Sequence, residues 1–250
     1  MRQEFERHVY AVQRYAAFTA QRYVPLFKSD VMTHPICSFG HIEKAHVITV
    51  GLNPSHGEFH KDRNWPPTMS HTDLAKRCCH YFHCSEESHR WFRPWSEALG
   101  HLGANYEAGT AAHLDLSPRA TRFVSEFKEA WEQTLFLEMV ERDLWTFFGT
   151  LALCRQVELI LMAGSVTGRY YINEFLGQFA PEHGYSLDGS FDRLEQRGSG
   201  KVAFHVLSDG NREIRVFFCS TSPSGKHKTI LPQRVKENAE KLVSGKNVRA

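Results

Sequence analysis

Apolar positions recur along the chain with two different periods, and the change of period marks the predicted elements. Residues 2–24 place apolar side chains from Phe5 to Ala16 at helical spacing, which predicts an amphipathic opening helix. Residues 45–55 form an apolar run dense in β-branched residues. A run of this kind indicates a strand buried on both faces, as in a parallel sheet.

The middle of the chain repeats this order of strand and helix. Residues 110–121 and 157–164 are two further apolar runs that predict strands, and the second leads into a turn of small residues and a helix. Between them, residues 123–155 show helical spacing that predicts two amphipathic helices. The alternation of strands and helices is typical of a layered α/β domain.

The last fifty residues predict a hairpin and a final helix. Residues 201–219 contain two alternating runs that flank the turn 208–211, whose Asp-Gly-Asn sequence favours a reversal of the chain. The final helix begins near Pro232, because proline suits the first turn of a helix. Together these elements predict a three-layer α/β/α fold with a central, mainly parallel sheet of four strands.

The chain is expected to form one domain over residues 1–250, with residues 56–110 as an elaborated insertion that carries short helices. Its 250 residues are enough for one large core and do not require two. The insertion is long, polar and rich in histidine, tryptophan and proline. Loops of that size inside a compact domain usually serve function.

Composition excludes several classes of protein. Lysine and arginine number 30 against 28 acidic residues, a net charge of +2, which argues against a protein that coats nucleic acid but permits a local basic groove. The first residues lack the apolar segment of a signal peptide, and the longest apolar stretch is too short to span a bilayer. Six cysteines are too few for a disulfide scaffold. We therefore expect a cytoplasmic protein with no membrane partner.

Three predicted strands end in turns that contain proline. These turns are Gly-Leu-Asn-Pro-Ser at 51–55, Asp-Leu-Ser-Pro-Arg at 115–119 and Thr-Ser-Pro-Ser-Gly at 221–225. Ligands of open α/β sheets bind at the carboxyl ends of the strands. Three such turns at corresponding strand ends therefore predict one assembled site.

These motifs resemble the uracil-DNA glycosylase superfamily. Gly51-Leu52-Asn53-Pro54 is similar to the water-activating motif of the mismatch-specific and single-strand-selective branches, and Ser222-Pro223-Ser224-Gly225 is similar to the second family motif. The stretch 160–168 resembles the third strand of the family and its glycine-rich turn. The resemblance runs in order over residues 45 to 230 and rests on short motifs.

The resemblance implies a monofunctional DNA glycosylase that needs no cofactor and no metal. Asn53 would orient the water that attacks the sugar, and Gly51 and Leu52 would line the base pocket. An amide is a weak base, so such a site depends on positioning and electrostatics. The alternative is that Asn53 and its proline only form a turn.

The second family motif is altered in this chain. Ser222 stands where the family has a histidine or an asparagine to aid the leaving base, and a hydroxyl is shorter and uncharged. Ser222 is kept as a catalytic candidate; alternatively, His227 or Lys226 replaces the function, the chemistry is slower, or the preferred base is a better leaving group. The resemblance assigns DNA contacts to the residues that follow it, namely Ser224, Gly225, Lys226, His227 and Lys228. The alternative for this basic run is a solvated surface loop.

Asp115 occupies the position from which the single-strand-selective branch reads the base with an asparagine, and Ser117 follows in the same motif. An ionised carboxylate only accepts hydrogen bonds, so it would repel uracil O4 and favour an exocyclic amino group such as cytosine N4. The expected substrate is therefore a cytosine-type base, and a modified one, because removing normal cytosine would damage the host genome. Alternatively, Asp115 caps the following turn.

A flipped base also needs an aromatic side chain on which to stack. Basic side chains are needed to contact the phosphates of the DNA backbone. Phe59 is the first choice for stacking and Trp65 the second, although both could be core aromatics. Arg119 is the expected phosphate contact, with Arg63 and Arg122 as further candidates.

Cysteines and histidines cluster between residues 71 and 89, and structural zinc is a minor alternative there. Adjacent Cys78 and Cys79 do not fit the spacing of a standard zinc knuckle, and the four-cysteine pattern of an iron–sulfur cluster is absent.

The leading expectation is removal of a modified cytosine from DNA by a monomeric enzyme, with antiphage defence as the setting. Three other readings stay open. They are a uracil or mismatch glycosylase of base-excision repair, a non-catalytic binder of modified DNA, and an enzyme of free nucleosides or nucleotides.

Overall fold

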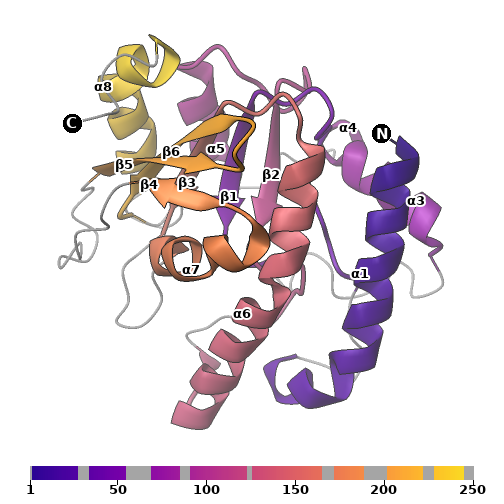
Figure 1. Ribbon diagram of the computed structural model, residues 1–250. Helices are drawn as coiled ribbons and strands as arrows, with labels where there is room; N and C mark the ends of the chain where they lie inside the picture. Colours follow the sequence, from indigo (N-terminus) through magenta and orange to yellow (C-terminus); the bar gives the residue numbers. More distant parts are fainter. Residues whose placement is uncertain are drawn as a thin grey trace.

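The chain folds into a mixed α/β structure around one mostly parallel sheet of six strands (Figure 1). We analyse a computed structural model. It describes residues 2–27, 34–54, 69–84, 91–122, 126–164, 172–188, 202–221 and 228–244. The strands are β1 Val47–Gly51, β2 Ala111–Asp115, β3 Leu159–Ala163, β4 Ser186–Asp188, β5 Val202–Ser208 and β6 Glu213–Cys219.

The strand order is β2-β1-β3-β6-β5-β4. The first four strands in this order are parallel, and their pairing matches the apolar runs that predicted a buried parallel sheet. All five residues of β1, β2 and β3 are buried. The predicted hairpin over 201–219 is confirmed, since β5 and β6 pair antiparallel. The expected count of four strands is wrong, because β5 and the short β4 extend the sheet by antiparallel pairing.

Seven α-helices and two short helical turns of the described residues cover and flank this sheet. The helices are α1 Arg2–Tyr23, α3 His71–Cys79, α4 Tyr81–Cys84, α5 Arg93–Gly100, α6 Ala130–Leu153, α7 Ile172–Phe179 and α8 Ile230–Ser244, and the turns are η1 Val24–Leu26 and η3 Ala180–His183. The short helices expected in the insertion are present as α3, α4 and α5.

The expectation of two helices over 123–155 is wrong, because α6 is one continuous helix. Gly149 lies within it and does not break it. A Cβ at Gly149 would lie 2.7 Å from Cε1 of His8, so glycine here permits the close approach of α1. The ring of His8 also contacts Trp145 of α6 edge-on.

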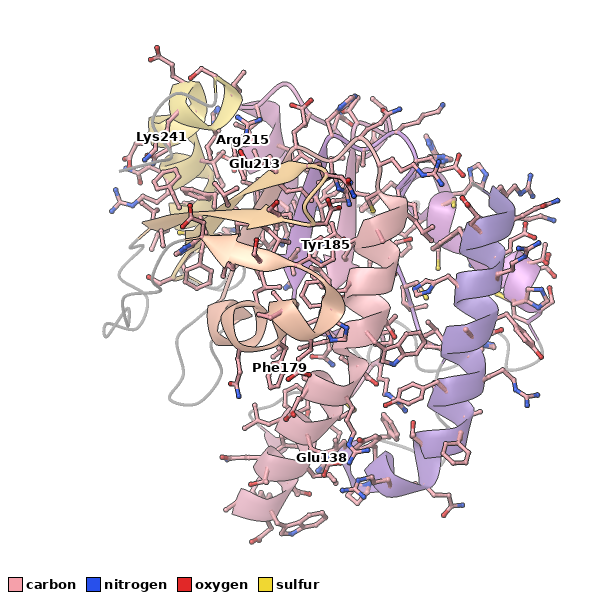
Figure 2. All side chains as sticks on the ribbon, viewed as in Figure 1. Glu138, Phe179, Tyr185, Glu213, Arg215 and Lys241 are labelled. Carbon is pink, nitrogen blue, oxygen red and sulfur yellow. The ribbon has the colours of Figure 1, made fainter. Side chains whose placement is uncertain are left out.

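Helices α1 and α6 lie side by side, with α3 on the other flank of α1 (Figure 1). Near the end of α6 that carries Glu138 (Figure 2), the carboxylate of this residue accepts from Arg22 at 2.6 Å and from the Tyr23 hydroxyl at 3.3 Å. At the other end, Phe148 stacks on His183 and contacts Tyr185. Helix α8 packs against α5 and β6.

Within the described part of the chain, every helix is too short or too polar to cross a membrane.

Candidate functional site

The carboxyl ends of four parallel strands meet at one edge of the sheet, as the three proline turns predicted. Gly51 at the end of β1 is in register with Asp115 at the end of β2. Ala163 at the end of β3 is in register with Cys219 at the end of β6. The chain therefore leaves β1, β2 and β6 at the same edge of the sheet.

The turns after β1 and β2 are joined beyond the strands by backbone hydrogen bonds. The N–H of Leu116 donates to the carbonyl of Gly51 at 3.1 Å, and the N–H of Ser117 donates to the carbonyl of Leu52 at 3.0 Å. The parallel ladder thus continues into both motifs. Two of the three motifs named in the sequence form one structural unit.

Asn53 locks this unit through its side-chain amide. Nδ2 donates to the carbonyls of Pro54 and Arg119, each at 3.1 Å, and to the Thr121 hydroxyl at 2.9 Å. Two of these acceptors are carbonyl oxygens, so the orientation of the amide is determined by the network. Among the described residues, Oδ1 receives no hydrogen bond. Asn53 is half-buried, and its free oxygen is the group that could orient a water.

Asp115 is buried and ends a chain of four polar side chains that runs under the strand edge. Its Oδ1 lies 3.3 Å from Nε2 of His113. Nδ1 of His113 lies 2.7 Å from Oγ1 of Thr49, which lies 2.5 Å from the hydroxyl of Tyr106. The described contacts of the Asp115 side chain lead to His113 and not to a backbone N–H of the next turn, which argues against the capping alternative.

Gly51 lets the Asp115 carboxylate lie directly over the end of β1. A Cβ at position 51 would overlap Oδ1 of Asp115 and would lie 3.1 Å from Nε2 of His113. It would also lie 3.2 Å from Cη2 of Trp91, which comes from the insertion. Three side chains therefore converge on the space that a larger residue at position 51 would need.

Aromatic rings enclose the imidazole of His113. Trp91 and Phe92 lie edge-on to it, with ring centroids at 4.9 and 5.1 Å, and Phe39 and Trp95 lie at 5.7 and 6.0 Å. Sequence reasoning missed His113 and Trp91. The polar residue inside an apolar strand could have revealed His113, but no local pattern marks Trp91, which reaches the site through the packing of the insertion.

The structure corrects the role expected of Arg119. Its side chain is fully buried and donates from Nε to Oδ2 of Asp143 at 2.8 Å. Other guanidinium nitrogens donate to the Ala16 carbonyl at 3.2 Å and to the Thr19 hydroxyl at 2.6 Å. A guanidinium in this position is enclosed by protein and does not present itself to a DNA phosphate.

Ser117 belongs to the same buried cluster. Its hydroxyl donates to Oδ2 of Asp143 at 2.7 Å, and the residue has no exposed surface. Burial raises the pKa of the Asp143 carboxyl, while the charge and hydrogen bonds of Arg119 and the hydroxyl of Ser117 oppose that rise. Ser117 therefore holds the turn in place, and its side chain is not a base contact as expected.

Several predicted site residues lie outside the described part of the chain. These are Phe59, Arg63, Trp65, Ser222, Ser224, Gly225, Lys226 and His227. Lys228 is described, is exposed, and lies just before α8. Arg122 pairs with Glu132 at 2.6 Å and so anchors the start of α6.

The described cysteines have the character of core residues. Burial raises the pKa of the Cys78 thiol to about 12 and that of Cys79 to about 11. His41 lies near His80 and His83, with ring centroids at 5.0 and 5.9 Å. Across the described residues, no group of three or more histidine, cysteine or acidic side chains has the arrangement of a metal site. Cys84 belongs to the predicted cluster, but its side chain lies outside the described part.

No model of a known protein family matches the chain, and no curated protein matches it. The family resemblance therefore rests on short sequence motifs alone.

Proposed function

We propose that this protein is a monofunctional DNA glycosylase that flips a pyrimidine nucleotide and hydrolyses its N-glycosidic bond. The observation that carries the proposal is the joining of Asn53 and Asp115 into one rigid rim at the carboxyl edge of the sheet. The rim offers one amide oxygen without a described partner and one buried carboxylate. The first can position the attacking water, and the second can read the edge of the base.

Asn53 orients the attacking water. Its Nδ2 hydrogen bonds fix the side chain, so Oδ1 can accept a hydrogen bond from a water placed under the sugar. The water oxygen then forms the bond to the anomeric carbon as the bond to the base breaks and its electron pair leaves with the base. The proton that the water loses passes to the departing base, directly or through solvent. Because the amide is not a strong base, catalysis rests on a positioned water and on stabilisation of the developing charges.

Asp115 reads the base. A carboxylate that receives a hydrogen bond from His113 still has acceptor capacity for a second donor, such as an exocyclic amino group. A pyrimidine with a carbonyl at the same position would meet repulsion instead. The substrate proposed is thus a cytosine-type base, in modified form, and antiphage defence is the setting in which such an activity would serve the host.

The basic turn at 224–228 completes the proposal on the DNA side. It follows β6, whose carboxyl end lies at the same edge as Gly51 and Asp115. Lys226, His227 and Lys228 would contact phosphates and Ser222 would aid the departing base. The proposed enzyme acts in the cytoplasm as a monomer, uses no cofactor, and has its helices in layers on both faces of the sheet.

A glycosylase assay tests the proposal. Oligonucleotides that carry one uracil, cytosine, hydroxymethylcytosine or glucosylated hydroxymethylcytosine are incubated with the protein and then cleaved with alkali at abasic sites. We expect strand breaks at a modified cytosine. Asn53→Ala should lower the rate by about 10²–10³, the usual cost of losing one catalytic hydrogen-bonding group. Asn211→Ala, at an exposed turn on the opposite edge of the sheet, is the matched control and should retain the wild-type rate.

Two outcomes would reject the catalytic proposal. One is the absence of breaks with every base while DNA binding is measurable, which would leave a non-catalytic binder of modified DNA. The other is full activity of Asn53→Ala, which would exclude the proposed role of this residue. Breaks only at uracil would instead favour a repair enzyme.

A further inference from the structure

The chain of hydrogen bonds behind Asp115 determines which atoms carry the protons. Tyr106 is buried, and burial raises the pKa of its phenol, so the hydroxyl keeps its proton. Its described side-chain partner is Oγ1 of Thr49, at 2.5 Å, and we assign the phenol as the donor of this hydrogen bond. Oγ1 of Thr49 lies 2.7 Å from Nδ1 of His113 and 3.5 Å from the carbonyl of Ala112, so we assign the Thr49 proton to the shorter contact.

This order leaves one arrangement for the imidazole. When Nδ1 accepts from Thr49, the proton of a neutral imidazole resides on Nε2, which donates to Oδ1 of Asp115 at 3.3 Å. In this arrangement Tyr106 donates to Thr49, Thr49 donates to His113, and His113 donates to the Asp115 carboxylate.

We propose that His113 is a positioning residue which, with Thr49 and Tyr106 behind it, holds Asp115 as a pure hydrogen-bond acceptor and so makes the pocket select bases with an amino group. The inference rests on the proposed function and adds the residues that determine its base preference. Without the donation from His113, the Asp115 carboxylate would have no described side-chain partner to orient it. Its oxygens would then no longer be held toward the amino group of the base, and the preference over a base with a carbonyl at that position would weaken.

Thr49 and Tyr106 do not touch the proposed base position. Their role is to hold the proton of His113 on the side that faces Asp115. Trp91 closes the site from the insertion, since its ring lies against both His113 and the space above Gly51. Base preference is therefore coupled to residues on β1, on β2 and in the insertion.

The experiment measures the ratio of cleavage rates for cytosine-type and uracil oligonucleotides in matched variants. His113→Phe removes the donation and should lower this ratio by about tenfold or more, which corresponds to the loss of one hydrogen bond to a charged group. His113→Gln keeps one donor and one acceptor and should retain most of the preference. Tyr106→Phe, which removes only a hydroxyl, should shift the ratio in the same direction by a smaller factor.

His8→Phe is the control for loss of a half-buried histidine. Nε2 of His8 lies 3.0 Å from the hydroxyl of Thr150, at the contact between α1 and α6. The control should leave the ratio unchanged even where it lowers stability. A purely structural role for His113 predicts that His113→Phe lowers both rates together and keeps their ratio, and this result would overturn the inference.

Binding separates this inference from the proposed reaction. Affinities for non-cleavable 2′-fluoroarabino oligonucleotides with the same bases are measured by fluorescence anisotropy. If the wild-type protein cleaves nothing but binds the amino-bearing base more tightly, and His113→Phe abolishes that difference, the inference stands although the reaction is wrong. If the wild-type protein discriminates neither in cleavage nor in binding, the inference is rejected.

Discussion

The side-chain amide of Asn53 donates to the hydroxyl of Thr121 at 2.9 Å, which ties the turn after β1 to the end of the turn after β2. The same amide donates to the carbonyl of Arg119. The Asn53 amide nitrogen donates to two carbonyl oxygens and to a hydroxyl whose own proton goes to the carbonyl of Arg122. The side chain at position 53 must therefore supply a hydrogen-bond donor to these oxygens as well as an oxygen for the water.

Asn53→Asp should for this reason be inactive, although aspartate is the stronger base. A carboxylate would face the carbonyls of Pro54 and Arg119 without a proton to share, and we expect the free energy of unfolding to fall by about 1–3 kcal/mol. Urea unfolding and the alkali assay measure the two effects. Thr121→Val, which removes one acceptor, should cost only about 1 kcal/mol. An active Asn53→Asp variant would show that the amide anchor is dispensable.

Removal of either partner of the buried Arg119–Asp143 pair should be strongly destabilising. Arg119→Met or Asp143→Asn leaves an isolated buried group, and we expect a loss of about 3–5 kcal/mol in urea unfolding. Arg22→Met breaks the more exposed pair with Glu138 between α1 and α6 and should cost about 1 kcal/mol or less. A reduced DNA affinity of Arg119→Met at unchanged stability would contradict the structural role.

Gly51→Ala should displace Asp115, because the new Cβ overlaps its carboxylate. Overpacking at a buried site costs about 1–3 kcal/mol, and the displaced carboxylate should also lose its discrimination between bases. Gly100→Ala is the matched control, since nothing lies within 4 Å of a Cβ there. Thermal unfolding and the ratio of cleavage rates are the measurements. Wild-type behaviour of Gly51→Ala would mean that the carboxylate is not where we describe it.

Stability should fall as the pH is lowered from neutral. Burial lowers the pKa of His8, His41 and His183 below the usual value near 6.5. The unfolded chain therefore takes up protons near pH 6.5 that the folded chain binds only at lower pH. The stabilisation is present above pH 6.5 and is lost as the pH falls through the lowered pKa values.

Urea midpoints at pH 7.5, 6.5 and 5.5 check this dependence. His8→Gln removes one of the titrating groups and should give a shallower decline than the wild-type protein over the same range. A midpoint that stays constant or rises on acidification would contradict the direction of these pKa shifts.

The parallel strands could be predicted because each combines a continuous apolar run with a turn at its end. Residues 45–55 and 157–164 show this, and β1 and β3 lie within them. The edge strand β4 gave no such signal, since it has three residues and no buried one. The continuity of α6 was not predicted, and Gly149 within it is explained by the ring of His8 on another helix.

Part of the candidate site could be predicted from the sequence because it lies at the ends of these strands. Asp115 is the last residue of its strand and Asn53 follows its strand, so topology alone places both residues at one edge of the sheet. The partners of Arg119 could not be foreseen, because Asp143 and Thr19 lie on other helices and only the fold brings them together. A charged residue next to a motif suggests a ligand contact when only the sequence is known. The structure shows that Arg119 is instead buried and paired with Asp143.

The contacts of Arg119 also bear on when the site forms during synthesis. Its partners on α1 lie 100 and 103 residues earlier in the chain, and Asp143 lies 24 residues later. A nascent chain that has emerged only as far as β2 contains Asn53 and Asp115 but neither Arg119 nor Asp143, so the frame that fixes their turns is still incomplete. We expect competence for the proposed reaction only once α6 has been synthesised.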